Sequence, residues 1–328
     1  MYLITGGAGF IGSNIAAQME QQGLGPIAIV DRLRDGQKWR NIAKRELYDV
    51  IAPETLSEFL DMCQNKIEAI IHMGAISSTT EANADLIYKN NFQFSIFLWD
   101  WCTAHQVPFI YASSAATYGD GSNGFVDDAS IEYLKKLRPL NMYGWSKHQF
   151  DLRLARVVKD EGVKPPQWVG LKFFNVYGPN EYHKDEMASV IAKAYPMAKE
   201  GTPFKLFKSH KEGYSDGGQL RDFVWVGDCV DIVLWFLKNR SNSGLFNCGS
   251  GMARSFLDVI NAVYKSVKRD SNIKFIDTPD NIRANYQYFT QASLTNLRDA
   301  GYSQPMTNIE NGIQHYISYY LDKNDRFC

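Results

Sequence analysis

The sequence has no long apolar segment and no excess of either charge. No apolar run reaches the ~18 residues that a membrane-spanning helix needs, and the N-terminal MYLITGGAGF lacks the basic and apolar regions of a signal peptide. The 35 Lys and Arg residues oppose 36 Asp and Glu residues, which leaves a net charge of -1 at pH 7. Neither nucleic acid nor an anionic membrane is therefore an expected partner. We expect a cytoplasmic protein that holds any anionic ligand by local groups.

Cysteine is scarce and scattered along the chain. The five cysteines, Cys63, Cys102, Cys229, Cys248 and Cys328, form no CxxC pair. This pattern favours free thiols in a reducing compartment over a disulfide framework or a zinc site. We therefore expect no bound metal.

The first half of the chain alternates short apolar strands with segments of helical spacing. The expected strands are Tyr2–Thr5, Ile27–Val30, Ala69–His72, Phe109–Ala112 and Trp168–Phe173. The expected helices are Ile11–Gln22, Glu54–Gln64, Leu86–Ala104 and Ser146–Lys159. Such alternation predicts right-handed βαβ units, and therefore an α/β protein with a doubly wound parallel sheet.

The second half of the chain has a different pattern. Its expected helices are Met187–Lys199, Asp228–Lys238, Phe256–Ser266 and Ile309–Leu321, with short strands and turns between them. The link Phe207–Arg221 is polar and rich in glycine, which predicts a mobile loop. We expect a smaller mixed α/β substrate-binding region over residues 175–328, at the C-terminal side of the sheet, with some segments returning to the first domain.

A glycine-rich loop joins the first expected strand to the first expected helix. The segment TGGAGFIG spaces Gly6, Gly9 and Gly12 as GxxGxxG. Glycine lets the backbone approach a pyrophosphate, and the helix N-terminus offers free N–H groups to that anion. Asp31, at the end of the second strand, has the spacing to accept from an adenosine ribose hydroxyl. The pattern predicts an NAD(P)-binding Rossmann-type domain over residues 1–174.

Three cations follow the acidic residue of this motif. Arg32, Arg34 and Lys38 follow Asp31 in the sequence. They can receive the 2′-phosphate of NADP, or they can belong to a solvated loop, which leaves NAD possible. We expect one NADP per subunit.

The segment YGWSK contains a YxxxK motif. Tyr143 and Lys147 are spaced i, i+4, so that their side chains lie on one face of a helix. A tyrosine has a pKa of about 10, and lowering that pKa to neutrality costs roughly 4 kcal/mol. One cation at ~4 Å supplies about that much in a partly screened site. Ser114, just after the fourth strand, can hydrogen-bond the reacting substrate oxygen, so that Ser114, Tyr143 and Lys147 form a candidate catalytic set instead of an ordinary amphipathic face.

Four motifs resemble the extended short-chain dehydrogenase family of nucleotide-sugar enzymes. They are TGGAGFIG, SSAATYG, YGWSK and FNVYGP. The dehydratases of that family carry an acidic pair soon after the Ser or Thr, whereas this chain has Ala115-Ala116-Thr117-Tyr118 there. The missing carboxylates argue against dehydration and favour simple redox chemistry or epimerisation.

A narrower resemblance extends over almost the entire chain. GPNEYHK at 178–184, SSTTE at 77–81, RDFV at 221–224 and YQYFTQA at 286–292 resemble the ADP-L-glycero-D-manno-heptose 6-epimerases. The resemblance implies inversion of C6 of the heptose in ADP-D-glycero-β-D-manno-heptose by transient oxidation and re-reduction with tightly bound NADP, for the inner core of lipopolysaccharide. It also implies a homo-oligomer and suggests a homopentamer.

The resemblance implies roles for individual residues. Inversion by redox presents the ketone in two orientations, and two acid–base groups suit it: Tyr143 and Lys184. Lys147 would bind the nicotinamide ribose and Ser114 the reacting hydroxyl. The expected cofactor-binding residues are Gly6, Gly9, Phe10, Ile11, Gly12, Asp31, Arg32, Lys38, Met73, Gly74, Ala75, Ile76, Ser77, Asn90, Tyr143, Lys147, Val176 and Lys184. The expected substrate-binding residues are Ser114, Asn175, Lys193, Phe207, Arg221 and Tyr286.

The chain departs from the resemblance in the substrate half. Asp185 and Glu186 follow Lys184, where the family often has small residues, and Lys193 stands where a histidine is common. The loop Phe207–Arg221 is also longer than expected. Two alternatives therefore stay open: another nucleotide-sugar epimerase or reductase, and a non-catalytic dinucleotide-binding regulator, which would have no need of the Ser, Tyr and Lys set.

Overall fold

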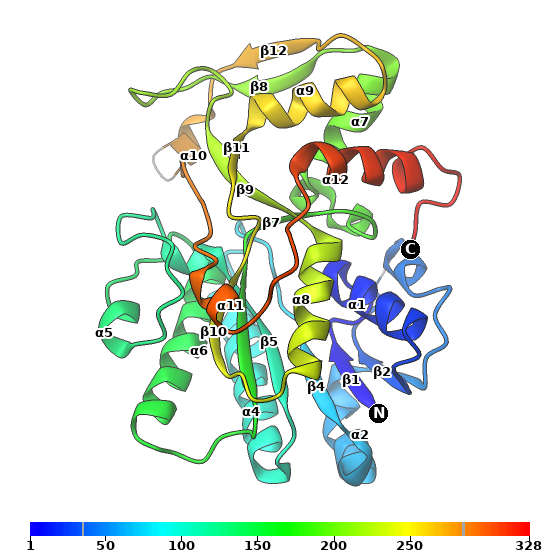
Figure 1. Cartoon of the computed structure of the whole chain (residues 1–328), viewed down its shortest axis with the longest axis vertical. Helices are drawn as coiled ribbons and strands as arrows, with labels where there is room; N and C mark the ends of the chain where they lie inside the picture. Colours follow the sequence, from blue (N-terminus) through cyan, green and yellow to red (C-terminus); the bar gives the residue numbers. More distant parts are fainter. Residues whose placement is uncertain (35, 284–285) are drawn as a thin grey trace.

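The computed structural model describes residues 1–34, 36–283 and 286–328, and its centre is a seven-stranded parallel sheet (Figure 1). The strand order is β10-β6-β5-β4-β1-β2-β3. The strands are β1 Tyr2–Thr5, β2 Ile27–Val30, β3 Asp49–Ile51, β4 Ala69–His72, β5 Phe109–Ser114, β6 Trp168–Phe173 and β10 Gly244–Cys248. The chain moves outward from β1 to β3 and then returns to β4 on the other side of β1. Such a reversal leaves a crevice at the C-terminal ends of the strands, where ligands bind in folds of this type.

Helices cover both faces of this sheet. Successive strand residues point to opposite faces, and Leu3 and Ile70 belong to one buried cluster, whereas Ile4 and Ile71 belong to another. The first cluster includes side chains of α2 Leu56–Cys63, α4 Phe94–His105 and α6 Met142–Lys159. The second includes α1 Phe10–Gln21 and α8 Val226–Lys238, which pack against each other. The predicted α/β fold with a doubly wound sheet is confirmed.

Two smaller sheets lie at the other end of the molecule, at the top of Figure 1. The first has β11 Ala253–Ser255, β9 Leu220–Trp225 and β7 Asn175–Tyr177, and the second has β12 Ile273–Ile276 and β8 Phe204–Phe207. They share a third buried cluster with α7 Val190–Glu200, α9 Phe256–Ser266 and α12 Ile309–Tyr316. The remaining helices are α3 Ala84–Ile87, α5 Ile131–Leu134, α10 Asp280–Arg283 and α11 Thr295–Asp299.

Short 3₁₀ and π turns complete the fold. They are η1 Lys38–Asn41, η2 Pro53–Thr55, η3 Gln64–Lys66, η4 Tyr88–Gln93, η5 Ala115–Tyr118, η6 Tyr182–Met187 and η7 Ile317–Leu321. In the described part of the chain, no helix combines the length and the apolarity needed to cross a membrane. Although β10 comes late in the sequence, it pairs with β6 in the large sheet. The division at residue 174 stays a prediction.

The observed elements differ from the predicted ones mainly at their ends. The predicted helix Leu86–Ala104 is a succession of α3, the π turn η4 and α4. Helix α6 begins at Met142, four residues before the predicted start, because the Asn141 side chain caps it by accepting from the Gly144 N–H at 2.8 Å. Similarly, α7 begins at Val190 and is capped by Ser189, whereas the predicted helix started at Met187. Asn141 lies two residues before Tyr143, and Ser189 lies five residues after Lys184.

Candidate active site

One large cavity extends from the C-terminal ends of the large sheet to the two smaller sheets. Its volume is about 1840 Å³, well above the ~300–1,000 Å³ typical of a site for one small ligand. It therefore has room for a dinucleotide together with a nucleotide sugar. Every cofactor-, substrate- and catalytic-site residue predicted from the sequence lines this cavity.

The glycine loop is packed too closely for side chains. Gly6 has a φ of +66°, and a Cβ on it would lie 2.6 Å from the backbone nitrogen of Gly74. A Cβ on Gly12 would lie 2.3 Å from the carbonyl oxygen of Gly6. Helix α1 begins at Phe10 and has no side-chain cap, so its first turn presents backbone N–H groups and a positive dipole end to the cavity. These features fit a pyrophosphate.

Asp31 lies beside this loop and is surrounded by donors. One carboxylate oxygen accepts from the Ala8 N–H at 2.9 Å, and the other from the Lys38 ammonium at 2.5 Å. Arg32 points away from Asp31, because its Nε donates to Glu54 at 2.9 Å. Its Nη1 lies 3.4 Å from the Asn90 side-chain oxygen. Cations and carboxylates thus alternate where an adenosine ribose would lie.

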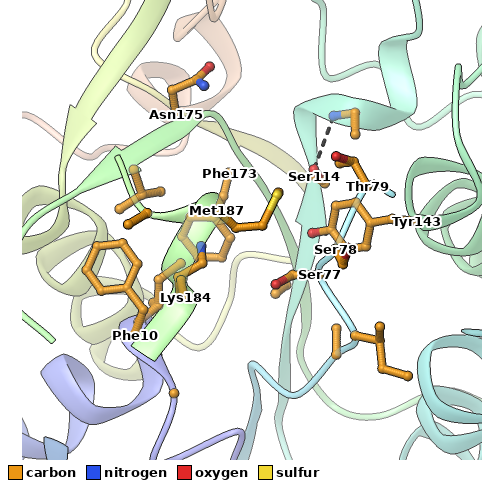
Figure 2. A pocket seen from close by; sticks show the side chains of 18 of the residues that line it. Phe10, Ser77, Ser78, Thr79, Ser114, Tyr143, Phe173, Asn175, Lys184 and Met187 are labelled. Atoms are coloured by element: carbon orange, nitrogen blue, oxygen red, sulfur yellow. Dashed lines mark hydrogen bonds between the residues drawn. The ribbon is translucent and has the colours of Figure 1, made fainter. Parts of the chain in front are cut away.

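Ser114 and Tyr143 face the cavity from neighbouring elements. Ser114 ends β5, and its hydroxyl oxygen accepts from the Ala116 N–H at 3.1 Å, the dashed line in Figure 2. Tyr143 is in the first turn of α6 and lines the cavity, as do Ser77 and Ser78 (Figure 2). Burial raises the pKa of Tyr143, while a hydrogen bond with Ser114 lowers it. The predicted Ser–Tyr pair is thus brought together, although burial alone opposes ionisation of the phenol.

Lys147 lies one helical turn after Tyr143 on the same helix. Lys147 is only 2% exposed. Burial lowers its pKa to about 8, whereas Asp151 raises it. Within the described residues, the ammonium has no hydrogen-bond partner. A buried cation with unused donors is costly unless a ligand accepts from it. The arrangement fits a ribose hydroxyl of a nicotinamide dinucleotide.

Lys184 approaches the cavity from the opposite side. It lies in the turn η6, and its ammonium is 5.5 Å from the centre of the Phe10 ring. Figure 2 shows Lys184 and Phe10 across the cavity from Tyr143 and Ser114, with Met187 and Phe173 between them. Burial lowers the pKa of Lys184, and the Glu181 carboxylate raises it. Two groups able to move protons therefore face the same space from two directions.

Arg221 occupies the substrate end of the cavity. It is 8% exposed and donates to the backbone oxygens of Leu220, at 2.9 Å, and Gln287. Its guanidinium lies 5.6 Å from the centre of the Tyr286 ring, and Tyr286 in turn meets Phe207 edge-on at 6.1 Å. A planar cation held among aromatic rings fits a phosphate group.

Two residues at which the sequence departs from the expected family pattern, Lys193 and Glu186, contact each other. The Lys193 ammonium donates to the backbone oxygen of Glu186 at 2.5 Å and lies 3.4 Å from its carboxylate. Both residues line the cavity. Lys193 and Glu186, which depart from the expected family pattern, thus form a pair.

Sequence reasoning missed several cavity residues. The sequence did not indicate Glu54 as a site residue, because only the fold brings it close to Arg32. His183 lies inside GPNEYHK, and its motif position could have revealed it. Burial lowers the pKa of His183 to about 4, and its Nδ1 is 3.2 Å from the Asn41 amide nitrogen. Across residues 1–34, 36–283 and 286–328, no three or more His, Cys, Asp or Glu side chains are grouped to hold a metal ion.

Known proteins resemble this chain along its entire length. Residues 2–249 match the NAD dependent epimerase/dehydratase family. The ADP-L-glycero-D-manno-heptose-6-epimerase of Fusobacterium nucleatum is 48% identical, and that of Nitratidesulfovibrio vulgaris strain DP4 is 44% identical, each over 100% of both chains. The crystal structure of the Helicobacter pylori ADP-L-glycero-D-manno-heptose-6-epimerase has a TM-score of 0.78 at 29% identity and covers 97% of this chain and 95% of that chain. The chain therefore belongs to the NAD dependent epimerase/dehydratase family, and within it to the ADP-L-glycero-D-manno-heptose-6-epimerases.

Proposed function

We propose that this epimerase inverts C6 of the heptose in ADP-D-glycero-β-D-manno-heptose, giving ADP-L-glycero-β-D-manno-heptose, with NADP as its cofactor. The observation that carries the proposal is the placement of Tyr143 and Lys184 on opposite sides of one cavity (Figure 2). The full-length similarity to epimerases named for this substrate supports the choice of sugar.

The glycine loop and Lys147 would hold the nicotinamide cofactor, which would supply the hydride exchange at C6 when bound. The hydroxyl proton at C6 must leave with each oxidation and return with each reduction. Because inversion requires the sugar to react in two orientations, its oxygen meets a different protein group in each. Tyr143 takes or gives the proton in one orientation, and Lys184 does so in the other.

The charges around Tyr143 and Lys184 suit their roles as the acid–base groups for the two orientations of the sugar. Lys147 lies one turn from Tyr143, and its cation favours the phenolate that a base requires. Ser114 holds the reacting oxygen close to the phenol. Lys184 is partly desolvated, which lowers its pKa and makes the neutral amine accessible as a base. Phe10 and Phe173 add apolar surface to the cavity near Lys184.

The proposal of NADP rests on the cations beside Asp31. Arg32, Arg34 and Lys38 line the adenosine end of the cavity. Glu54 competes for Arg32, but the two side chains are 60% and 44% exposed, respectively. An exposed pair contributes at most about 1 kcal/mol, so a 2′-phosphate can displace Glu54 from Arg32. Titration with NADP and NAD, and mass spectrometry of the cofactor released from purified enzyme, test this assignment.

At the other end of the cavity, Arg221 would bind the diphosphate of the substrate. Phe207 and Tyr286 would enclose its adenosine half, and Asn175 and Lys193 the sugar. We also infer a cytoplasmic homo-oligomer, with the pentameric assembly that its family resemblance suggests, which supplies lipopolysaccharide inner-core synthesis. Light scattering at working concentration tests the assembly.

The decisive experiment is incubation with ADP-D-glycero-β-D-manno-heptose and no added reductant. The C6 epimer should accumulate to equilibrium, as followed by NMR, without net change in the cofactor. Folded, cofactor-loaded enzyme that forms no epimer would disprove the proposal. Net consumption of added NADPH would instead indicate a reductase.

A further inference from the structure

We infer that Glu181 is a positioning residue for Lys184: its carboxylate closes the loop that presents the lysine to the substrate. The inference rests on the proposed function, in which Lys184 serves one of the two orientations of the sugar. Glu181 belongs to the GPNEYHK segment but does not line the cavity. Its effect on the reaction is therefore exerted through Lys184.

The Glu181 carboxylate is buried and accepts from donors on both sides of the loop. The residue is 1% exposed. Before the turn η6, the Gly178 N–H lies 3.3 Å from Oε1. After the turn, Ser189 donates its N–H to Oε2 at 2.5 Å and its hydroxyl to Oε1 at 2.7 Å. The carboxylate thus joins the two ends of segment 178–189.

The closed loop is fixed to the helices around it. The Tyr316 hydroxyl of α12 donates to Glu181 Oε1 at 3.0 Å. Ser189 is also the N-cap of α7, since its hydroxyl oxygen accepts from the Ala192 N–H at 3.2 Å. At the start of the loop, the Asn14 amide of α1 donates to the Pro179 oxygen at 2.9 Å. The loop is therefore held relative to α1, which forms the cofactor end of the cavity.

Lys184 lies in the middle of this closed loop. Its backbone N–H donates to the Glu181 carbonyl oxygen at 3.0 Å. Its ammonium reaches the Phe10 ring at the start of α1. Two parts of Glu181 therefore act on the same residue, since the side chain sets the shape of the loop and the backbone orients Lys184 within it.

Charge couples the two residues as well. Glu181 raises the pKa of Lys184, against the lowering by burial. Burial raises the pKa of Glu181, whereas the Ser189 donors and Lys184 lower it. Of the neighbouring groups, His183 has a pKa lowered to about 4, partly by Lys184, and Glu186 is exposed and contacts Lys193. Glu181 is thus a buried counter-charge for the catalytic lysine.

A matched control exists outside the loop. Asp228 of α8 is also a buried carboxylate, at 7% exposure, and accepts from the Thr307 N–H at 2.8 Å and the Thr307 hydroxyl at 2.7 Å. Its loss removes a similar set of hydrogen bonds without touching segment 178–189. It therefore reports the effect of destabilisation alone.

The test compares Glu181→Gln and Asp228→Asn holoenzymes in single-turnover reduction of the bound nicotinamide, started separately from each C6 epimer. Each epimer loses its hydroxyl proton to a different group, so misplacement of Lys184 should slow only one of the two reactions. A displacement of ~1 Å can slow catalysis roughly 100-fold, and we expect Glu181→Gln to slow one epimer roughly 10- to 100-fold more than the other. Asp228→Asn should affect both equally. Equal slowing of both epimers by Glu181→Gln would overturn the inference.

Two further variants separate the possible failures. Lys184→Met should show the same asymmetry, and equal slowing of both epimers by Lys184→Met would contradict the two-base function itself. Tyr316→Phe removes one donor and keeps the charge of Glu181, so it should give a smaller asymmetry of the same sense even if Glu181→Gln fails to fold. A folded Tyr316→Phe enzyme in which both epimers react at equally changed rates would count against the inference.

A readout independent of turnover examines the charge. Removing the carboxylate lowers the pKa of Lys184, so that more neutral amine is present near pH 8. Acylation by a small amine reagent, followed by peptide mass spectrometry, should label Lys184 faster in Glu181→Gln than in the wild-type and Asp228→Asn holoenzymes. An unchanged labelling rate would contradict the electrostatic part of the inference.

Discussion

Lys147 lies one turn along α6 from Tyr143, and its buried ammonium has no hydrogen-bond partner among the residues that the structure describes. The same helix carries Asp151 a further turn away, which raises the pKa of Lys147 against the effect of burial. Helix α6 thus presents a phenol, a cation and a carboxylate in sequence. Of these three groups, the Lys147 ammonium is the one whose hydrogen bonds a bound ligand would complete.

This relationship makes cofactor binding depend on pH. The pKa of Lys147 is about 8, and a cofactor that accepts hydrogen bonds from the ammonium favours the protonated form. Above that pH, binding requires uptake of a proton, so affinity should fall by up to about tenfold per pH unit. Below it, affinity should be nearly constant. Titrations that extend about two pH units to either side of that pKa, on wild type and Lys147→Met, check this, and a wild-type curve parallel to that of Lys147→Met would contradict it.

Replacement of Tyr143 by phenylalanine removes the acid–base group and leaves the ring in place. General acid–base groups contribute roughly 10²- to 10⁴-fold to rate, so kcat for epimerisation should fall within that range while cofactor remains bound. Product formation and released cofactor are measured on the same preparation. Tyr133→Phe, which removes a phenol that does not line the cavity, is the control. Intact activity of Tyr143→Phe would overturn the catalytic assignment.

Glu54 should tune the choice between NADP and NAD. Since Glu54 holds Arg32, Glu54→Gln should free the guanidinium for a 2′-phosphate and tighten NADP by up to about fivefold, which corresponds to ~1 kcal/mol for an exposed pair. NAD affinity should change little. Glu58→Gln removes the same charge from the exposed side of α2 and serves as the control. Equal responses of both cofactors would show that Glu54 does not discriminate between them.

Much of this site could be predicted from the sequence because its motifs are local. TGGAGFIG places its glycines by close backbone contact, and the spacing of Tyr143 and Lys147 places both on one helix face. Strands β1, β2, β4 and β6 have the predicted bounds, since each is a short apolar run between helices. The strand β10 was not predicted, because its place in the sheet depends on pairing with β6 from a distant part of the chain.

The parts that could not be predicted depend on tertiary contacts. Nothing near Glu54 or Arg32 in sequence shows that these two residues meet. Lys193 pairs with Glu186 only because of the way in which α7 follows the turn η6. The Glu181 motif position was visible, but its four donors come from Gly178, Ser189 and Tyr316. Such contacts arise when separate elements pack together, so sequence spacing carries little information about them.

Arg221 should affect substrate affinity more than turnover. Arg221→Lys keeps a cation but loses the planar fork that donates two hydrogen bonds. A hydrogen bond to a charged group contributes about 1.5–3 kcal/mol, so KM for the nucleotide sugar should rise roughly 10- to 100-fold with a smaller change in kcat. Arg254→Lys is the control, because Arg254 lies on the adjacent strand β11 and pairs with Glu310 of α12. A fall in kcat without a change in KM would contradict this role.

The ion pair between Lys172 and Asp151 should stabilise the elements that carry the catalytic set. Both side chains are fully buried, with 2.6 Å between the ammonium and the carboxylate, and Lys172 also donates to Thr117 at 2.8 Å. Breaking a buried pair by removing one partner costs about 3–5 kcal/mol, because the other charge is left unpaired. Lys172→Met should therefore lower the urea midpoint of unfolding strongly, and the double variant with Asp151→Asn should recover part of that loss. Lys159→Met, which breaks an exposed pair between Lys159 of α6 and Glu132 of α5, should cost less than about 1 kcal/mol. Equal losses of stability from Lys172→Met and Lys159→Met would mean that the buried Lys172–Asp151 pair stabilises the fold no more than the exposed pair does.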